Sequence, residues 1–177
     1  LLSCNPSDSA EILIKASQHH NVQTRRETAS SLQRIASDDF RLALSLMDTL
    51  LADKDSDVRV ISATYLASLA RSDRHLFIEK AKPALERSEV RLTKRIVDSA
   101  IREYLSSDSF DRAGLLPLAW ASSDQSTKSK LAGLIIQQSE ENYEGFADTC
   151  RRFREIGNDT FSDLKSFILR RDSSMEV

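Results

Sequence analysis

Basic side chains recur along this chain at a spacing that suits the binding of carboxylate or phosphate groups. Arg25 and Arg59 lie 34 residues apart, and each precedes an alanine by four residues, at Ala29 and Ala63. A guanidinium presents a planar set of N–H donors that matches the oxygens of a carboxylate or a phosphate. Such an arginine can hold the protein together from within or bind a partner from outside, and the sequence leaves both roles open.

Residues suited to metal binding or nucleophilic catalysis do not form a recognisable pattern. His19 and His20 are adjacent, so on a helix they point about 100° apart and do not readily ligate one ion. No serine lies in a Gly-x-Ser-x-Gly turn, and the sequence has no glycine-rich phosphate loop. Cys4 and Cys150 are far apart, which indicates reduced thiols rather than a disulfide. The sequence therefore predicts no catalytic residue, no metal, no cofactor and no small-molecule substrate.

The composition indicates a folded, helical protein. Of 177 residues, 40% are apolar and 29% are charged, and there are only 4 glycines and 3 prolines. The net charge of −2 is neither strongly basic, as in many nucleic-acid-binding proteins, nor strongly acidic. No apolar run approaches 18 residues, so we expect no membrane-spanning helix and no membrane partner. We expect a cytoplasmic protein, or a nuclear one if its source is eukaryotic.

An internal repeat organises the sequence. Residues 24–36 superpose on residues 58–70, with Leu32 over Leu66 and Ala36 over Ala70. A fixed period of this length is typical of a solenoid, in which each unit buries its apolar face against its neighbours. A compact helical bundle is the alternative fold.

The apolar periodicity predicts about ten helices in five consecutive hairpins. The second helices begin near residues 22, 57, 89, 125 and 159. We expect Pro83 to kink or divide its helix, and Gly114 to weaken a short helix at about 110–121. We expect residues 1–177 to form a single domain that is a fragment of a larger protein. Its predicted hairpins are 8–36, 38–71, 73–105, 109–139 and 140–171.

Residues 50–69 resemble a HEAT repeat. The match rests on an aspartate in the turn, Val-Arg at the start of the second helix, and alanine and leucine farther along it. It is partial for 8–36, where Thr24-Arg25 replaces Val-Arg, and for 73–105, where Arg95 occupies the usual alanine position. It is weak for 110–139, and only the hairpin rhythm remains in 140–171. The residues that carry it are Asp53, Val58, Arg59, Ala63 and Leu66.

The resemblance implies an all-α, right-handed superhelix of about five antiparallel hairpins. In HEAT proteins the turn aspartate and the following arginine form a hydrogen-bonded ladder between successive repeats. That ladder role falls here on Asp53, Arg59 and Arg91, together with Arg25.

The resemblance also implies that the second helices line a concave face on which HEAT proteins usually bind. These five helices together carry a charge of +7 in a chain of net charge −2. They suggest a basic stripe for an acidic peptide or a phosphate backbone, unless the basic residues merely follow the preference for helix C-termini. The candidate partner-binding residues are Arg25, Arg59, Lys94, Arg95 and Lys128.

These observations favour a non-catalytic scaffold or adaptor that binds a protein through its concave face. The alternative is a solenoid that contacts the phosphates of a nucleic acid. A purely structural spacer is a third interpretation. Alkylpurine DNA glycosylases also use HEAT-like repeats, but they need exposed aromatic side chains and a carboxylate beside them. Trp120, Tyr65, Tyr104 and Asp98 are weak candidates for those roles.

Overall fold

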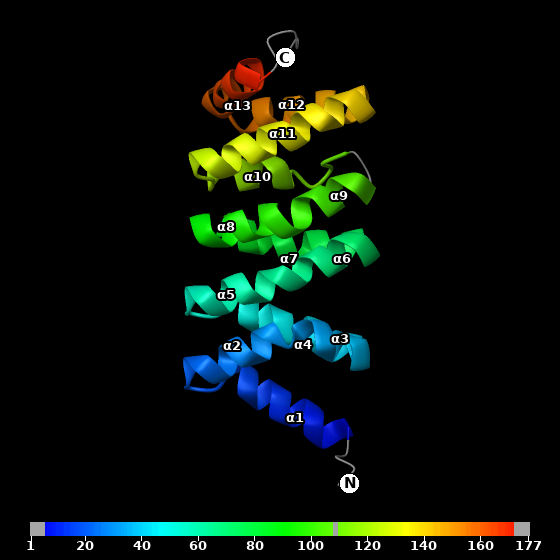
Figure 1. Cartoon of the computed structure of the whole chain (residues 1–177), viewed down its shortest axis with the longest axis vertical. Coiled ribbons are helices and arrows are strands. Elements are labelled where there is room, and N and C mark those ends of the chain that lie inside the picture. The colour runs from blue at the N-terminus through cyan, green and yellow to red at the C-terminus, as the bar shows by residue number, and fades with distance from the viewer. Residues whose placement is uncertain (1–5, 108–109, 172–177) are drawn as a thin grey trace. The chain divides into compact units, whose positions relative to one another are not determined.

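The computed structural model describes residues 6–107 and 110–171, and every regular element among them is helical (Figure 1). This confirms the all-α prediction. By internal contacts the chain divides into two compact units, Leu1–Tyr65 and Leu66–Val177, called here the first and the second unit. The prediction of a single domain over 1–177 stays a prediction. No helix in the described part of the chain is both long and apolar enough to cross a membrane.

The first unit consists of helical hairpins whose equivalent helices contact each other. α1 packs on α2 within one hairpin, and α4 packs on α5 within the next. Across the hairpins α1 contacts α4, and α2 contacts α5. The core between them is fully buried at Leu32, Leu46 and Val58. The elements of this unit are α1 (Pro6–Ser17), α2 (Val22–Ser30), α3 (Leu32–Asp38), α4 (Phe40–Leu51), α5 (Ser56–Ser62) and the 3-10 turn η1 (Ala63–Tyr65).

The second helix predicted over 22–36 is divided between α2 and α3. Ser31 separates the two, and the hydroxyls of Ser30 and Ser31 both donate to the carbonyl of Glu27. Serine hydroxyls that bond back to the preceding turn compete with the helical ladder and bend helices. Leu32 and Ile35 beyond the break are still buried, so the break leaves the apolar face intact.

The second unit repeats this packing over more helices. α7 contacts α10, which contacts α12, and α11 contacts α13. α6 packs on α7 and also on the later helix that contains η2 and α9. The elements are α6 (Leu66–Ser72), α7 (Arg74–Glu86), α8 (Val90–Ile96), the π-helical segment η2 (Val97–Ile101), α9 (Arg102–Ser107), α10 (Leu115–Ala121), α11 (Gln125–Glu141), α12 (Tyr143–Ile156) and α13 (Asn158–Arg171).

Short acidic or amide side chains begin six of these helices. In six cases a side-chain oxygen at the N-cap accepts a backbone N–H from the first turn, which contributes about 1 kcal/mol per helix. The first four of these caps keep the period of the sequence, because residues 21 and 55, and residues 39 and 73, are each 34 apart. The six capping residues are Asn21, Asp39, Asp55, Asp73, Asp124 and Asn142.

The short helix predicted at 110–121 begins five residues later than expected. Gly114 has a φ of 68°, in the left-handed region that favours glycine, and α10 starts at the next residue. The buried carboxylate of Asp111 accepts the N–H groups of Leu115 and Leu116 at 2.9 and 2.8 Å, and the hydroxyl of Tyr104 at 2.9 Å. The turn before α10 is therefore fixed by a carboxylate placed four residues ahead of the helix.

Pro83 does not divide its helix, which was one of the two effects expected from the sequence. α7 runs from Arg74 to Glu86 through Pro83. Phe77, Ala81, Ala84 and Leu85 are all buried on either side of the proline. This packing holds the helix together in spite of the hydrogen bond that proline cannot donate.

Candidate functional site

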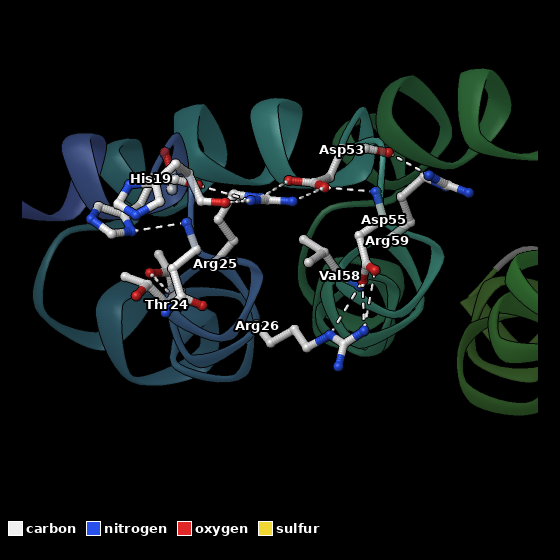
Figure 2. A network of polar contacts seen from close by, with 12 residues as sticks. His19, Thr24, Arg25, Arg26, Asp53, Asp55, Val58 and Arg59 are labelled. Carbon is white, nitrogen blue, oxygen red and sulfur yellow. Dashed lines mark hydrogen bonds and ion pairs between the residues drawn. The ribbon is translucent and has the colours of Figure 1, made fainter.

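Arg25 and Asp53 form a buried ion pair in the first unit. Nε and Nη2 of Arg25 donate to Oδ2 and Oδ1 of Asp53 at 2.6 and 3.0 Å (Figure 2). The two side chains are only 5% and 7% exposed. A bidentate pair of this kind is stable in the interior only when its remaining hydrogen-bonding groups are also satisfied.

Those remaining groups are satisfied by the turns at the ends of the first helices. Nη1 of Arg25 donates to the carbonyl oxygens of His19 and His20 at 2.8 and 3.2 Å, and Oδ1 of Asp53 accepts the N–H of Asp55 at 2.8 Å. Arg59 in turn donates to the carbonyl oxygen of Asp53. Figure 2 shows these contacts as one line of polar groups from His19 through Arg25 and Asp53 to Arg59.

One of these contacts repeats with the period of the sequence. Arg25 donates to the carbonyl six residues before it, at His19, and Arg59 donates to the carbonyl six residues before it, at Asp53. The first hairpin lacks a turn aspartate, yet its arginine still bonds the carbonyl at the equivalent position. The carbonyl contact therefore does not depend on the carboxylate.

Arg26 lies beside Arg25 in sequence but makes different contacts. Its guanidinium bonds Asp55 at 3.1 Å and Asp57 at 2.8 Å, at the start of α5. The Arg26 side chain is 31% exposed. Adjacent arginines thus provide a buried link from α2 to the turn between α4 and α5, through Arg25, and a more exposed link from α2 to the start of α5, through Arg26.

The charges in this network lower the pKa of Asp53. Burial alone raises the pKa of this carboxyl, but the hydrogen bonds from Arg25 and from the N–H of Asp55, with the charge of Arg25, lower it below its ordinary value. The pKa of Asp55 is also lowered, because the N–H of Val58 and the guanidinium of Arg26 outweigh its burial. Both carboxylates are therefore held in the charged form.

Two of the candidate partner-binding residues are thus directed inward. Arg25 was expected as a partner contact or a ladder residue, and its side chain is only 5% exposed where it pairs with Asp53. Arg59 is half-buried and bonds the Asp53 carbonyl.

The candidate residue Lys128 is also engaged, in the second unit. Its Nζ contacts Oδ2 of Asp163 at 2.6 Å and lies 5.5 Å from the centre of the Trp120 ring. The indole N–H of Trp120 donates to the same carboxylate oxygen at 3.1 Å. The Lys128 side chain is 20% exposed, so it joins α11 to α13 rather than projecting freely.

The remaining predicted residues lie on one helix of the second unit. Arg91, Lys94 and Arg95 are all exposed on α8. The charge of Lys94 lies close enough to Asp124 to help lower the pKa of that carboxyl. The predicted ladder role of Arg91 stays a prediction.

An open groove of about 620 Å³ lies in the second unit, along helices that the sequence identified as second helices. Residues of η2, α9, α11 and the end of α13 line it. Its cationic side chains come from three helices: Arg102 of α9, Lys130 of α11 and Arg171 of α13. The carboxylates of Asp98 and Glu103 also line it.

The two carboxylates of this groove are already paired. Lys130 Nζ contacts Asp98 Oδ1 at 2.5 Å, and Arg71 of α6 contacts Glu103 at 3.7 Å. Among the described residues the guanidinium of Arg102 has neither a hydrogen-bond nor an ion-pair partner. The groove therefore presents at least one cation that no carboxylate of the described chain neutralises.

Arg171 reaches the groove because α11 carries a glycine there. Nη2 of Arg171 donates to the hydroxyl of Ser129 at 2.9 Å. A Cβ atom placed on Gly133 would lie 2.6 Å from Nη1 of Arg171. The absence of a side chain at Gly133 thus provides the space that the Arg171 guanidinium occupies against α11.

The helix that forms one side of the groove contains the π-helical segment η2. Val97, Asp98 and Ser99 of this segment all line the groove. One wide turn shifts the following residues around the helix axis, and such turns are frequent at functional sites. The position of Arg102 directly after the wide turn is therefore set by η2.

Sequence reasoning counted Arg102, Lys130 and Arg171 as part of the basic second helices but did not select them. The available signal was their distribution over three consecutive second helices, together with a glycine inside α11. It did not show which cations are left unpaired.

The aromatic and thiol side chains that the sequence offered as candidates for base or nucleophile chemistry are buried where the structure describes them. Tyr65, Tyr104 and Trp120 are at most 5% exposed, so none provides an aromatic surface for a flipped base. Cys150 is buried in α12, and burial raises the pKa of its thiol to about 11, while Cys4 lies outside the described residues. No cluster of three His, Cys, Asp or Glu residues suited to a metal occurs in 6–107 or 110–171.

Comparisons with protein-family models, with curated proteins and with solved structures found no match for this chain.

Substituting either of the two adjacent arginines should give very different losses of stability. Arg25→Ala leaves the buried carboxylate of Asp53 without its charge partner, and we expect a loss of about 3 kcal/mol or more in unfolding free energy. Arg26→Ala removes a more exposed pair and should cost about 1 kcal/mol or less. Urea unfolding followed by circular dichroism measures both. Similar losses for the two variants would contradict a buried, tightly coupled Arg25–Asp53 pair.

The lowered pKa of Asp53 should appear in the pH dependence of stability. Its folded pKa lies below the unfolded value of about 3.9, so its stabilisation is complete above that pH and is lost as the pH falls through the folded pKa. The difference in unfolding free energy between the native chain and Asp53→Asn should therefore be largest above about pH 5 and shrink toward pH 2. A difference that stays constant across this range would mean that the Asp53 charge does not stabilise the fold.

Gly133→Ala should change the position of Arg171 in the groove without lowering the stability of α11. Alanine is favoured over glycine in a helix by about 1 kcal/mol, and the group it displaces is the flexible end of Arg171. We expect unchanged or higher thermal stability, with Arg171 moved away from Ser129. Trp120 is the only tryptophan and lies in the second unit, so its fluorescence reports the unfolding of this unit. A loss above about 1 kcal/mol would show that Arg171 has no room to move.

Proposed function

We propose that this chain is a non-catalytic binding module, a HEAT-like right-handed superhelix that holds a protein partner on its second helices. Two features of the first unit support the architecture. Equivalent helices of successive hairpins contact each other, and the arginine-to-carbonyl contact recurs after 34 residues, from Arg25–His19 to Arg59–Asp53. A repeating hairpin with repeating internal bonds is what a solenoid requires.

The groove of the second unit carries the functional proposal. It is an open hollow along consecutive second helices, and it contains the guanidinium of Arg102, which has no partner within 6–107 or 110–171. An exposed cation in a groove attracts an anionic group and fixes its orientation once it is bound. The exposed Lys94 and Arg95 of α8 lie on the same composite helix as Arg102 and add positive charge. An acidic protein segment is therefore the partner that this surface fits best.

A nucleic acid is the second candidate, because the second helices are all mildly basic. Its phosphates would release counterions on binding, and affinity would fall steeply as salt is added. Binding to a protein segment with apolar as well as charged contacts would be less sensitive to salt. The net charge of −2 and the carboxylates of Asp98 and Glu103 in the groove favour the protein partner.

Charge reversal in the groove, at Arg102, and on the adjoining helix α8, at Arg95, should remove the partner while leaving the fold intact. The test variant is Arg95→Glu with Arg102→Glu, and the matched control is Lys82→Glu with Arg87→Glu. All four side chains are exposed, and the control pair lies on or directly after α7. Each variant lowers the net charge by the same amount, so a non-specific effect of charge would affect both equally.

The measurement is recovery of partners from a lysate of the source organism, with and without nuclease, after circular dichroism has shown equal helicity. We expect proteins that survive nuclease, are retained by the control variant and are lost by at least about tenfold in the groove variant. Recovery of nuclease-sensitive material would favour the nucleic-acid candidate. Equal recovery by both variants would rule out this groove as the binding surface.

A further inference from the structure

We propose that the groove of the second unit receives a phosphorylated serine or threonine side chain of the partner segment. This inference rests on the proposed protein-binding function and specifies its ligand. It is carried by the number, type and pairing of the charges that meet in the groove.

Four cations and two carboxylates meet in this region. Arg102, Lys130 and Arg171 line the groove, and Arg71 pairs with Glu103 at its edge. With Lys130 paired to Asp98 and Arg71 to Glu103, the two arginines Arg102 and Arg171 remain as an excess of two positive charges in the main groove, and the carboxylate of Glu141 lines the adjoining smaller hollow. A phosphorylated side chain carries a charge of about −1.5 to −2 at pH 7, whereas a glutamate side chain carries −1. The excess charge therefore matches a phosphate monoester better than a single carboxylate.

The two arginines have donors available for such a group. Arg102 has no partner among the described residues, and the guanidinium of Arg171 bonds the neutral hydroxyl of Ser129. Guanidinium groups bind phosphate oxygens in pairs of parallel hydrogen bonds, and a phosphate offers three such oxygens. The Lys130 and Asp98 side chains are 50% and 34% exposed, so their pair is solvated and Lys130 can turn toward a second anion.

The surroundings of the groove fit one phosphate rather than a row of them. Asp98 and Glu103 both line the hollow and would repel the neighbouring phosphates of a nucleic-acid strand. The chain as a whole carries a net charge of −2, which gives no long-range attraction for a polyanion. A single phosphate within an otherwise uncharged peptide avoids both penalties.

A second, smaller hollow continues the groove and provides for the flanking peptide. It shares Arg102, Leu134 and Gln137 with the main groove and adds the half-buried Leu105. Leucine side chains on both α9 and α11 can cover an apolar residue of the partner. The continuity of the two hollows indicates an extended segment rather than a free phosphate ion.

The test uses the full chain and fluorescently labelled degenerate peptides, with four randomised positions on each side of a fixed residue. The fixed residue is phosphoserine in one pool, serine in the second and glutamate in the third. We expect fluorescence anisotropy to show at least about tenfold tighter binding of the phosphoserine pool than of the serine pool. Equal binding of the phosphoserine and serine pools, within about twofold, would overturn the inference.

Variants test whether the phosphate sits in this groove. Arg102→Glu should weaken binding of the phosphoserine pool by at least about tenfold, and the exposed control Lys82→Glu should leave it unchanged. Asp98→Asn should tighten binding, because it removes a neighbouring negative charge and frees Lys130. Gly133→Ala should weaken binding by displacing Arg171 without loss of stability. A gain and a loss of affinity in folded variants cannot both arise from misfolding.

The other outcomes separate this inference from the proposed function. The three pools could bind equally well, and Arg102→Glu could abolish that binding. This result would overturn the phosphate ligand but would support the groove as a protein-binding site. Failure of every pool, with binding of a single-stranded oligonucleotide, would overturn both. Inorganic phosphate could compete with the labelled phosphoserine pool as strongly as the unlabelled pool does. This result would show that the groove recognises phosphate alone and would overturn the choice of a protein segment as its ligand.

Discussion

A buried guanidinium must find a partner for its charge and for its N–H groups, and this requirement shapes the first unit. Arg25 projects from α2 and reaches the turn of its own hairpin at His19 and the turn of the next hairpin at Asp53. The N–H donors of its guanidinium can be satisfied only if the turns at His19 and at Asp53 both lie within hydrogen-bonding distance of the Arg25 side chain. The ion pair therefore fixes the position of the second hairpin relative to the first. Apolar packing alone would specify this position less closely.

The second unit meets the same need for cross-links with different chemistry. Lys128, Asp163 and the indole of Trp120 join α11 to α13, and Asp111 with Tyr104 fixes the start of α10. These groups are satisfied within the fold, which leaves them unavailable to a ligand. The cations of the groove differ because their carboxylate neighbours are fewer. Arg102 thus keeps a guanidinium that no carboxylate of the described residues pairs with.

Much of the local structure could be predicted from the sequence because its causes are local. Asp39, Asp55 and Asp73 each stand one to three residues before the first apolar residue of a helical pattern, and each caps the helix that follows. The cap of α10 could not be predicted in this way. Asp111 acts across Gly114 from four residues ahead, and the left-handed turn that brings it back is not marked by any periodicity.

The candidate site was less predictable because it depends on tertiary contacts. Arg25 and Arg26 are identical in type and adjacent, and only the packing of α2 on α5 decides that one is buried and the other half-exposed. Arg102, Lys130 and Arg171 come from separate helices, and their convergence follows from contacts of α11 with α13 and from the wide turn η2. The sequence could indicate which helices are basic, but not which cations remain unpaired.

The buried thiol of Cys150 makes the rate of its alkylation a measure of local opening in the second unit. Burial raises the pKa of this thiol to about 11, so the thiolate is a minor species at neutral pH. Alkylating reagents require the thiolate and physical access, so they modify this side chain only when α12 separates from its neighbours. The rate of labelling at this position, distinguished from Cys4 by peptide mass, would therefore time the transient opening of the second unit without an engineered probe.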